Sequence, residues 1–306
     1  MPEPIRERPD VLVLGVGGTL GEAWLRGLLS GLESVSGIDF RDCRSFVGSS
    51  AGSIVAATLA AGRRPQAGDR AARAWGEAVP EADDEPSRLG RALRDAGRLG
   101  VAAASPLAPV ALAGVAPAGR ALRAAALAVA PRSRRKMSGL GRHLDALGSR
   151  FDGRLRVAAV DRRSGRRVMF GAPGAPRASV TDAVLASCAV PWFFAPVRIG
   201  GREYVDGGVW SPTNLDAAPA GRGTRVLCLV PTAALGSARG ALGALRAFST
   251  SALIAESFAL RARGAHVRTV VPDAAAGALM GMNLMDPSRS EAVLDAAFAQ
   301  GRALAG

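Results

Sequence analysis

Histidine is nearly absent from this chain of 306 residues, which contains only His143 and His266. Most serine hydrolases need a histidine to take the proton of the nucleophile. His143 lies in a basic, Ala-rich segment and His266 at the start of an expected strand, so a Ser-His-acid triad is poorly supplied.

Cysteine is also scarce. The three cysteines, Cys43, Cys188 and Cys228, are an odd number without paired spacing, which argues against a disulfide framework and favours a reducing compartment. Residues 1–10 are polar and charged, and the apolar run that follows, 11–14, is too short for the core of a signal peptide. We therefore expect a cytoplasmic protein.

Acidic residues are outnumbered, with 26 Asp and Glu against 39 Lys and Arg, which leaves a formal net charge of +13. Lys136 is the sole lysine, so the cations are otherwise arginines. Such a surface attracts anionic partners, either nucleic acid or acidic lipid headgroups. Aromatic residues make up only 5% of the chain and do not interleave with the cations, so we predict no nucleic-acid partner.

The chain does contain a regular alternation of short apolar runs and helix-compatible segments, and its 48% hydrophobic content suffices for a large core. This alternation predicts an α/β fold in three layers, with a central, mostly parallel sheet covered by helices on both faces. The expected strands are 11–14, 45–47, 155–160, 167–170, 225–230 and 266–271, and the expected helices are 21–34, 53–59, 180–187, 242–263 and 290–304.

The stretch of about 80–150 departs from this alternation. It is Ala-rich, carries Pro106, Pro109, Pro117 and Pro131, and predicts a helical insertion or cap. Its uncharged part, 99–119, is long enough to span a membrane, but the prolines favour a cap over a pocket or an element lying on a membrane surface. The cations of 132–136 then fit either a solvated loop or a peripheral contact with the headgroups of the inner membrane face.

The pentapeptide Gly48-Ser49-Ser50-Ala51-Gly52 has the pattern G-x-S-x-G between an expected strand and an apolar helix. At such a turn the serine is held in a strained conformation with its hydroxyl presented outward, and the flanking glycines avoid collisions with neighbouring backbone. Ser50 is therefore the candidate nucleophile. A helix entry made of small residues, without catalytic meaning, remains the alternative.

A glycine-rich turn, residues 15–21, follows the first expected strand and would lie at the same edge of a parallel sheet as Ser50. Backbone N–H groups of Gly17, Gly18 and Thr19 are candidates for an oxyanion hole. Gly15 and Gly17 also open a dinucleotide fingerprint, but its third glycine falls one place late, at Gly21. A purely structural turn between strand and helix is the remaining alternative.

Asp206, followed by Gly207 and Gly208, is the candidate base. The glycines allow a sharp turn and the close approach of another loop. A carboxylate has an unperturbed pKa near 3.9, so it becomes an adequate base only in a desolvated pocket beside the serine. Taken alone, Asp-Gly-Gly is also typical of a hairpin turn.

Together these motifs resemble the patatin-like phospholipases, lipid acyl hydrolases with a Ser-Asp dyad. The resemblance rests on three motifs in the family's order, 17–21, 48–52 and 206–208, and on the segments 186–196 and 211–214 around the aspartate. It implies a single patatin-like domain over 1–306, with Ser50 as nucleophile, Asp206 as base and the first glycine loop as oxyanion hole.

The resemblance also implies a lipid or acyl-ester substrate and an acyl-enzyme intermediate. The chain departs from the family at Val16, where a glycine is usual, and at Leu20, where a cation is usual. We expect no cofactor and no metal, because no calcium or zinc ligand cluster is visible. Two alternatives stay open: an α/β-hydrolase esterase with His266 as base, and a lipid-binding member of the fold with weak or no activity. The sequence does not predict the oligomeric state.

Overall fold

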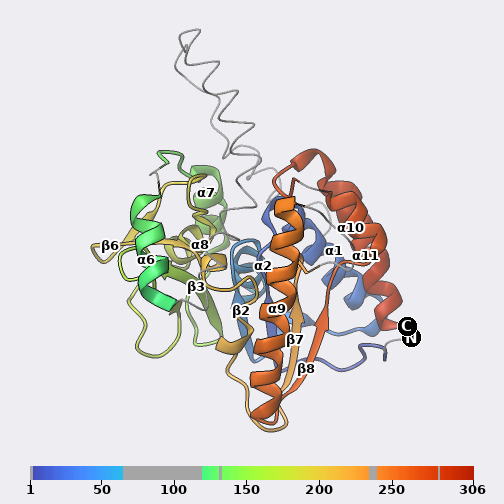
Figure 1. The fold of residues 1–306 in the computed structure, drawn as a ribbon. Coiled ribbons are helices and arrows are strands. Elements are labelled where there is room, and N and C mark those ends of the chain that lie inside the picture. The colour runs from blue at the N-terminus through green and yellow to red at the C-terminus, as the bar shows by residue number, and fades with distance from the viewer. Residues whose placement is uncertain (1–2, 65–118, 131–132, 234–239, 282) are drawn as a thin grey trace.

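In the part of the chain that the structure describes, the strands form one sheet of eight (Figure 1). The computed structural model describes residues 3–64, 119–130, 133–233, 240–281 and 283–306. Each strand is hydrogen-bonded to the next along the path β5-β6-β3-β2-β1-β7-β8, and β4 also pairs with β3. The strands are β1 (Val11–Leu14), β2 (Ser45–Gly48), β3 (Leu155–Asp161), β4 (Arg167–Phe170), β5 (Val197–Ile199), β6 (Arg202–Asp206), β7 (Arg225–Leu229) and β8 (His266–Val270).

Five neighbouring strands, β3, β2, β1, β7 and β8, are parallel, whereas β4 and β6 run antiparallel to β3. The six strands expected from the sequence are all present. The hairpin of β5 and β6 was not expected, because these strands are short and polar positions interrupt them. The sequence predicted a sharp turn at Asp206 and the two glycines that follow it. In the structure, β6 continues to Asp206, and a short 3-10 helix, Gly207–Val209, follows.

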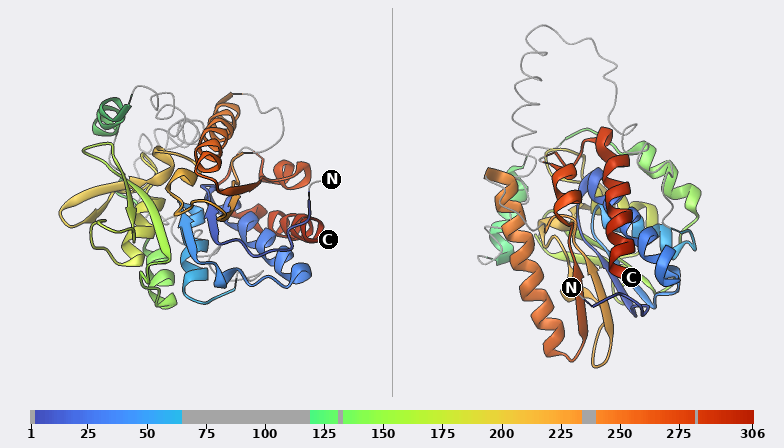
Figure 2. Two further views of the ribbon diagram at one scale, coloured as in Figure 1. Left: turned by 90° about the horizontal axis from the view of Figure 1, so that it is seen from below. Right: turned by 90° about the vertical axis from the view of Figure 1, so that its right-hand side faces the viewer.

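Helices cover both faces of the sheet (Figure 2), so the expected three-layer α/β architecture is confirmed. Alternate residues of the strands divide between the two cores: Leu12 and Leu14 pack into one, and Val11 and Val13 into the other. The first layer holds α1 (Gly18–Ser36), α2 (Ala51–Ala60), α7 (Ser138–Leu147), α8 (Val180–Cys188), α10 (Ala274–Met280) and α11 (Ser290–Ala305), and the second holds α6 (Gly119–Val129) and α9 (Gly240–Ala262).

The expected insertion contributes two helices to the described part of the chain. α6 packs on the second face of the sheet through Leu127, and α7 joins the larger core through Leu140 and Leu144. Residues 80–118, which include most of the uncharged stretch, lie outside the described residues. Among the helices that the structure describes, none is long and apolar enough to cross a membrane.

The C-terminal helix α11 lies against α1 at unusually close range. A Cβ atom on Gly27 or Gly31 of α1 would lie 2.2 Å from a carbonyl oxygen of α11, and one on Gly301 would lie 2.3 Å from a carbonyl oxygen of α1. Glycine is therefore required at these positions for the two backbones to touch. The chain ends meet here too, since Ile5 donates a hydrogen bond to the carbonyl of Leu304.

Candidate active site

Ser50 lies at the sharp turn between β2 and α2 that the sequence predicted. Its backbone has φ 51° and ψ −125°, a left-handed conformation that few residues other than glycine adopt. Among the hydrogen bonds that hold the turn, Ser49 N–H donates to the Leu14 carbonyl (3.1 Å) and Ser50 N–H to the hydroxyl of Ser187 (2.9 Å). The strained turn places Ser50 beside the first residue of a helix, where the backbone dipoles favour negative charge.

The glycines of this turn are explained by close backbone contacts. A Cβ atom on Gly52 would lie 2.1 Å from the carbonyl oxygen of Leu14, and one on Gly48 would lie 2.5 Å from Cα of Ser53. Only glycine permits the start of α2 to touch the end of β1 in this way. The contact brings the Ser50 turn and the glycine loop, 15–21, together at one edge of the sheet.

The pairing of β3 with its neighbours places Asp206 at the level of Ser50. Val157 pairs with Gly48 on one side and with Phe170 of β4 on the other, while Ala159 pairs with Asp206 and again with β4. β2 and β6 therefore pair with the same edge of β3: β2 with its first residues and β6 with its last residues. Asp206 stands two residues beyond Gly48, about 7 Å along the strand direction.

The carboxyl group of Asp206 is buried, with the residue 4% exposed. Burial raises its pKa to about 7, although the Gly208 N–H and the Ser50 hydroxyl act to lower it. Gly208 N–H donates to Oδ1 at 2.6 Å, whereas Oδ2 has no hydrogen-bond partner among the described residues. In catalytic pairs such a hydrogen bond often forms only when substrate binds.

The glycine loop runs from β1 into α1, so the first turn of α1 faces the same region. In the part of the chain that the structure describes, the N–H groups of Gly17, Gly18 and Thr19 donate to no protein acceptor, as expected at a helix start. Gly18 has φ +60° and is half-buried, whereas Gly17 and Thr19 are buried. These amides are available to an anion that reaches the loop.

The two departures in this loop have structural explanations. The side chain of Val16 fills the space against Gly208, because a Cβ atom on Gly208 would lie 2.9 Å from Cγ1 of Val16. Val16 thus packs the glycine loop against the turn that follows Asp206. Leu20 is fully buried in the larger core. An apolar residue there fits the interior and supplies no positive charge to the site.

Asn214 connects the two halves of the site, a contact that the sequence did not predict. Its side-chain amide donates to the hydroxyl of Ser49 (2.9 Å), beside Ser50, and to the carbonyl of Gly207 (3.3 Å), beside Asp206. Its oxygen accepts from Arg167 (3.2 Å), which is paired with Asp216 at 2.8 Å. The segment 211–214 had been noted for its resemblance alone, so a signal existed but its role required the tertiary contacts.

Replacing Asn214 with alanine should therefore lower kcat on a soluble acyl ester about 100-fold with little change in KM, because Ser50 and Asp206 lose their common support. Ser49→Ala, which removes a single one of these bonds, should cost about tenfold. Steady-state kinetics check both values, and circular dichroism checks the fold. A kcat for Asn214→Ala equal to that of the wild type would show that the contact is not needed.

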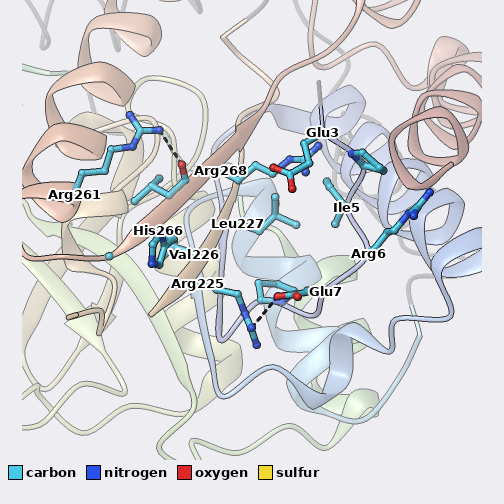
Figure 3. A pocket seen from close by; sticks show the side chains of 14 residues that line it. Glu3, Ile5, Arg6, Glu7, Arg225, Val226, Leu227, Arg261, His266 and Arg268 are labelled. Atoms are coloured by element: carbon cyan, nitrogen blue, oxygen red, sulfur yellow. Dashed lines mark hydrogen bonds and ion pairs between the residues drawn. The ribbon is translucent and has the colours of Figure 1, made fainter. Parts of the chain in front are cut away.

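His266 lies at the other end of the sheet. It is the first residue of β8 and pairs with the first residue of β7, whereas Ser50 follows the last residue of a parallel strand. Figure 3 shows His266 in a pocket of about 730 Å³ that it lines together with Arg225 and the N-terminal segment, including Ile5. This position rules out His266 as the base for Ser50.

The remaining expectations concern metals, thiols and cations. Within the described ranges, no group of three or more His, Cys, Asp or Glu side chains could hold a metal ion. Cys43, Cys188 and Cys228 are all buried free thiols. Of the expected basic run, the described residues Arg134, Arg135 and Lys136 are exposed. Arg135 lies over the ring of Phe193, in the segment that leads to β5.

The chain is similar to a known protein family over about two thirds of its length. The family model described as patatin-like phospholipase matches residues 12–219. That span begins in β1 and contains the glycine loop, the Ser50 turn, Asp206 and Asn214. No curated protein matches the chain.

Proposed function

Because the chain belongs to the patatin-like phospholipase family, we propose that it hydrolyses acyl esters of phospholipids or related lipids through Ser50 and Asp206. The observation that carries the proposal is the pairing of β3, which sets a buried carboxyl group beside a serine in a strained strand-to-helix turn. A pKa near 7 makes that carboxyl group a suitable base at neutral pH.

In the proposed reaction, Asp206 accepts the proton of Ser50 as Oγ attacks the ester carbonyl carbon. The resulting oxyanion is held by the N–H groups of Gly17, Gly18 and Thr19. When the tetrahedral intermediate collapses, protonated Asp206 returns the proton to the leaving alcohol and an acyl-enzyme remains. Asp206 then takes a proton from a water molecule as the water oxygen attacks the acyl carbon. The bond from that carbon to Ser50 Oγ breaks, Asp206 returns the proton to Oγ, and the fatty acid is released.

Backbone dipoles would supply most of the charge stabilisation in this scheme. The first turns of α1 and α2 meet at the site, and such helix starts favour developing negative charge. Leu20 adds no cation, so the oxyanion relies on amides alone. The presence of Leu20 where a cation is usual also favours the second candidate, a catalytically weak lipid-binding member of the fold.

The test is labelling with a fluorophosphonate, which reacts with an activated serine, followed by peptide mass spectrometry. We expect a single adduct at Ser50 in the native protein, none after heat denaturation, and fatty-acid release from a short-chain acyl ester. A native protein that takes no label, releases no fatty acid and still binds phospholipid vesicles would support the lipid-binding candidate instead.

A further inference from the structure

The outer side of α9 exposes two large apolar side chains. Ile254 is 65% exposed and Phe258 is 74% exposed, and a spacing of four residues places them next to each other on the helix. The other exposed positions between 247 and 258 are small and uncharged. We define the α9 face as these six residues: Ala247, Thr250, Ser251, Ile254, Ala255 and Phe258.

Positive charge predominates in the part of the chain that contains the α9 face. The sequence 217–272 contains seven arginines and a single acid, Glu256. Beyond Phe258, the arginines at positions 222, 261 and 263 are exposed, and Gly264 brings the 222 position against the end of α9. The α9 face is thus an uncharged surface bordered by exposed cations at the end where β7 and β8 begin, which is the opposite end of the sheet from Ser50.

The second helical layer is also where large apolar side chains are most exposed. Val129 at the end of α6 is 83% exposed, and α6 lies on the same side of the sheet as α9 (Figure 2). On the other layer, Val35 is 46% exposed and Leu279 is 37% exposed, on two separate helices. Helices of that first layer carry acids such as Asp182 and Glu291. The two layers therefore present different chemistry to a partner.

Glu256, the one acid of this region, connects the α9 face to the candidate active site. Its carboxylate points inward, accepting hydrogen bonds from the Thr213 hydroxyl and from the Leu215 N–H (2.7 Å). These residues flank Asn214, which contacts both sides of the dyad. The helix that carries Ile254 and Phe258 is thus fastened to the loop that follows Asp206.

We infer that the α9 face is the docking surface of this protein on an anionic lipid bilayer. The inference rests on the proposed function, since a lipid hydrolase must reach substrate held in a membrane. Phe258 and Ile254 would enter the boundary between headgroups and acyl chains, and the neighbouring arginines would contact anionic headgroups. Docking would thereby engage the helix that supports the Asp206 loop.

The first experiment is sedimentation with vesicles of ether-linked phosphatidylglycerol and phosphatidylcholine, which contain no acyl ester. Binding is thus measured without hydrolysis, and its failure is distinguishable from failure of the catalytic proposal. We expect Ile254→Ser with Phe258→Ser to lower the partition coefficient at least tenfold. Replacing Arg222, Arg261 and Arg263 with glutamine should abolish the preference for phosphatidylglycerol, and the matched control Val35→Ser should bind as the wild type does.

A second experiment reports insertion directly. All three native cysteines are buried, so Phe258→Cys provides one accessible thiol for an environment-sensitive fluorophore. Its emission should shift to the blue on anionic vesicles, whereas a label at Val35→Cys should not. The inference is overturned if neither label responds, if neutralising Arg134, Arg135 and Lys136 removes binding while the α9 variants retain it, or if Phe258→Ser only converts a dimer into monomers.

Discussion

Replacing Asp206 with asparagine should lower kcat for a soluble acyl ester about 1000-fold or more. The amide keeps an oxygen for the Gly208 N–H, which donates to Oδ1 at 2.6 Å in the wild type, so the turn should be preserved. It cannot accept a proton, so Ser50 loses its base. Ser50→Ala should reduce turnover at least as much and should abolish fluorophosphonate labelling.

The pH dependence should follow the same carboxyl group. Burial raises the pKa of Asp206 to about 7, so kcat/KM of the wild type should reach half of its plateau near pH 7 and level off about one pH unit higher. The residual rate of Asp206→Asn should lack this ascending limb. If kcat/KM of the wild type instead rises around pH 4, the proton transfer belongs to another group. The same conclusion follows if kcat/KM of the variant depends on pH as that of the wild type does.

Stability should change in the opposite direction to activity. The folded protein holds the Asp206 pKa above the value of 3.8 for a free side chain, so folding favours its protonated form. The contribution of Asp206 to the free energy of unfolding is fully present below pH 3.8, and it is lost as the pH rises to about 7. At pH 8, where the wild type buries the charge, Asp206→Asn should raise the free energy of unfolding by up to ~4 kcal/mol. Urea denaturation at pH 8 and pH 4 would measure the difference.

Replacing Gly52 with alanine adds one methyl group, and we expect this addition to lower stability and turnover more than a methyl group added elsewhere in the site. The new Cβ atom would lie 2.1 Å from the carbonyl oxygen of Leu14 and 2.7 Å from that of Gly15. Both are backbone atoms, so relief requires α2 to separate from the glycine loop. We expect the free energy of unfolding to fall by about 3 kcal/mol or more and turnover by at least about 100-fold.

Gly141→Ala is the matched control for this substitution. Gly141 also lies in a helix, α7, but its Cβ atom would meet only Leu185 at an ordinary 3.6 Å. Alanine favours a helix over glycine by up to about 1 kcal/mol, so this variant should be as stable as the wild type or more stable. Denaturant unfolding compares the two. Equal stabilities for the Gly52 and Gly141 variants would contradict the close contact.

Much of the fold could be predicted from local sequence patterns. Apolar runs such as 11–14 and 225–230 mark strands buried on both faces, and glycines mark the points at which β1 and β2 end. The hairpin of β5 and β6 was missed because its strands are short and are not apolar runs. Its consequence is large, since the position of β6 beside β3 is what sets Asp206 at the level of Ser50.

The residues that support the site could not be predicted, because their partners are distant in sequence. Ser187 accepts a hydrogen bond from Ser50 across 137 positions, and Asn214 reaches Ser49 across 165. Glu256 could have been noticed as the single acid between Asp216 and Asp273, yet its role depends on α9 packing over the loop at 213–215. Sequence motifs therefore indicated the candidate reacting residues, whereas the hydrogen bonds that support them could be identified only in the folded chain.

We expect that the segment that carries the family motifs does not fold by itself. It ends at residue 219, before β7, yet β7 pairs with β1 along the whole of Val11–Leu14. Pro231 then packs against the glycine loop, where a Cβ atom on Gly17 would lie 2.7 Å from its ring. Helix α11 contributes the backbone contact with α1 still later. A fragment trimmed to the motifs would expose one edge of β1, so we expect stable folding to require the C-terminal third of the chain as well.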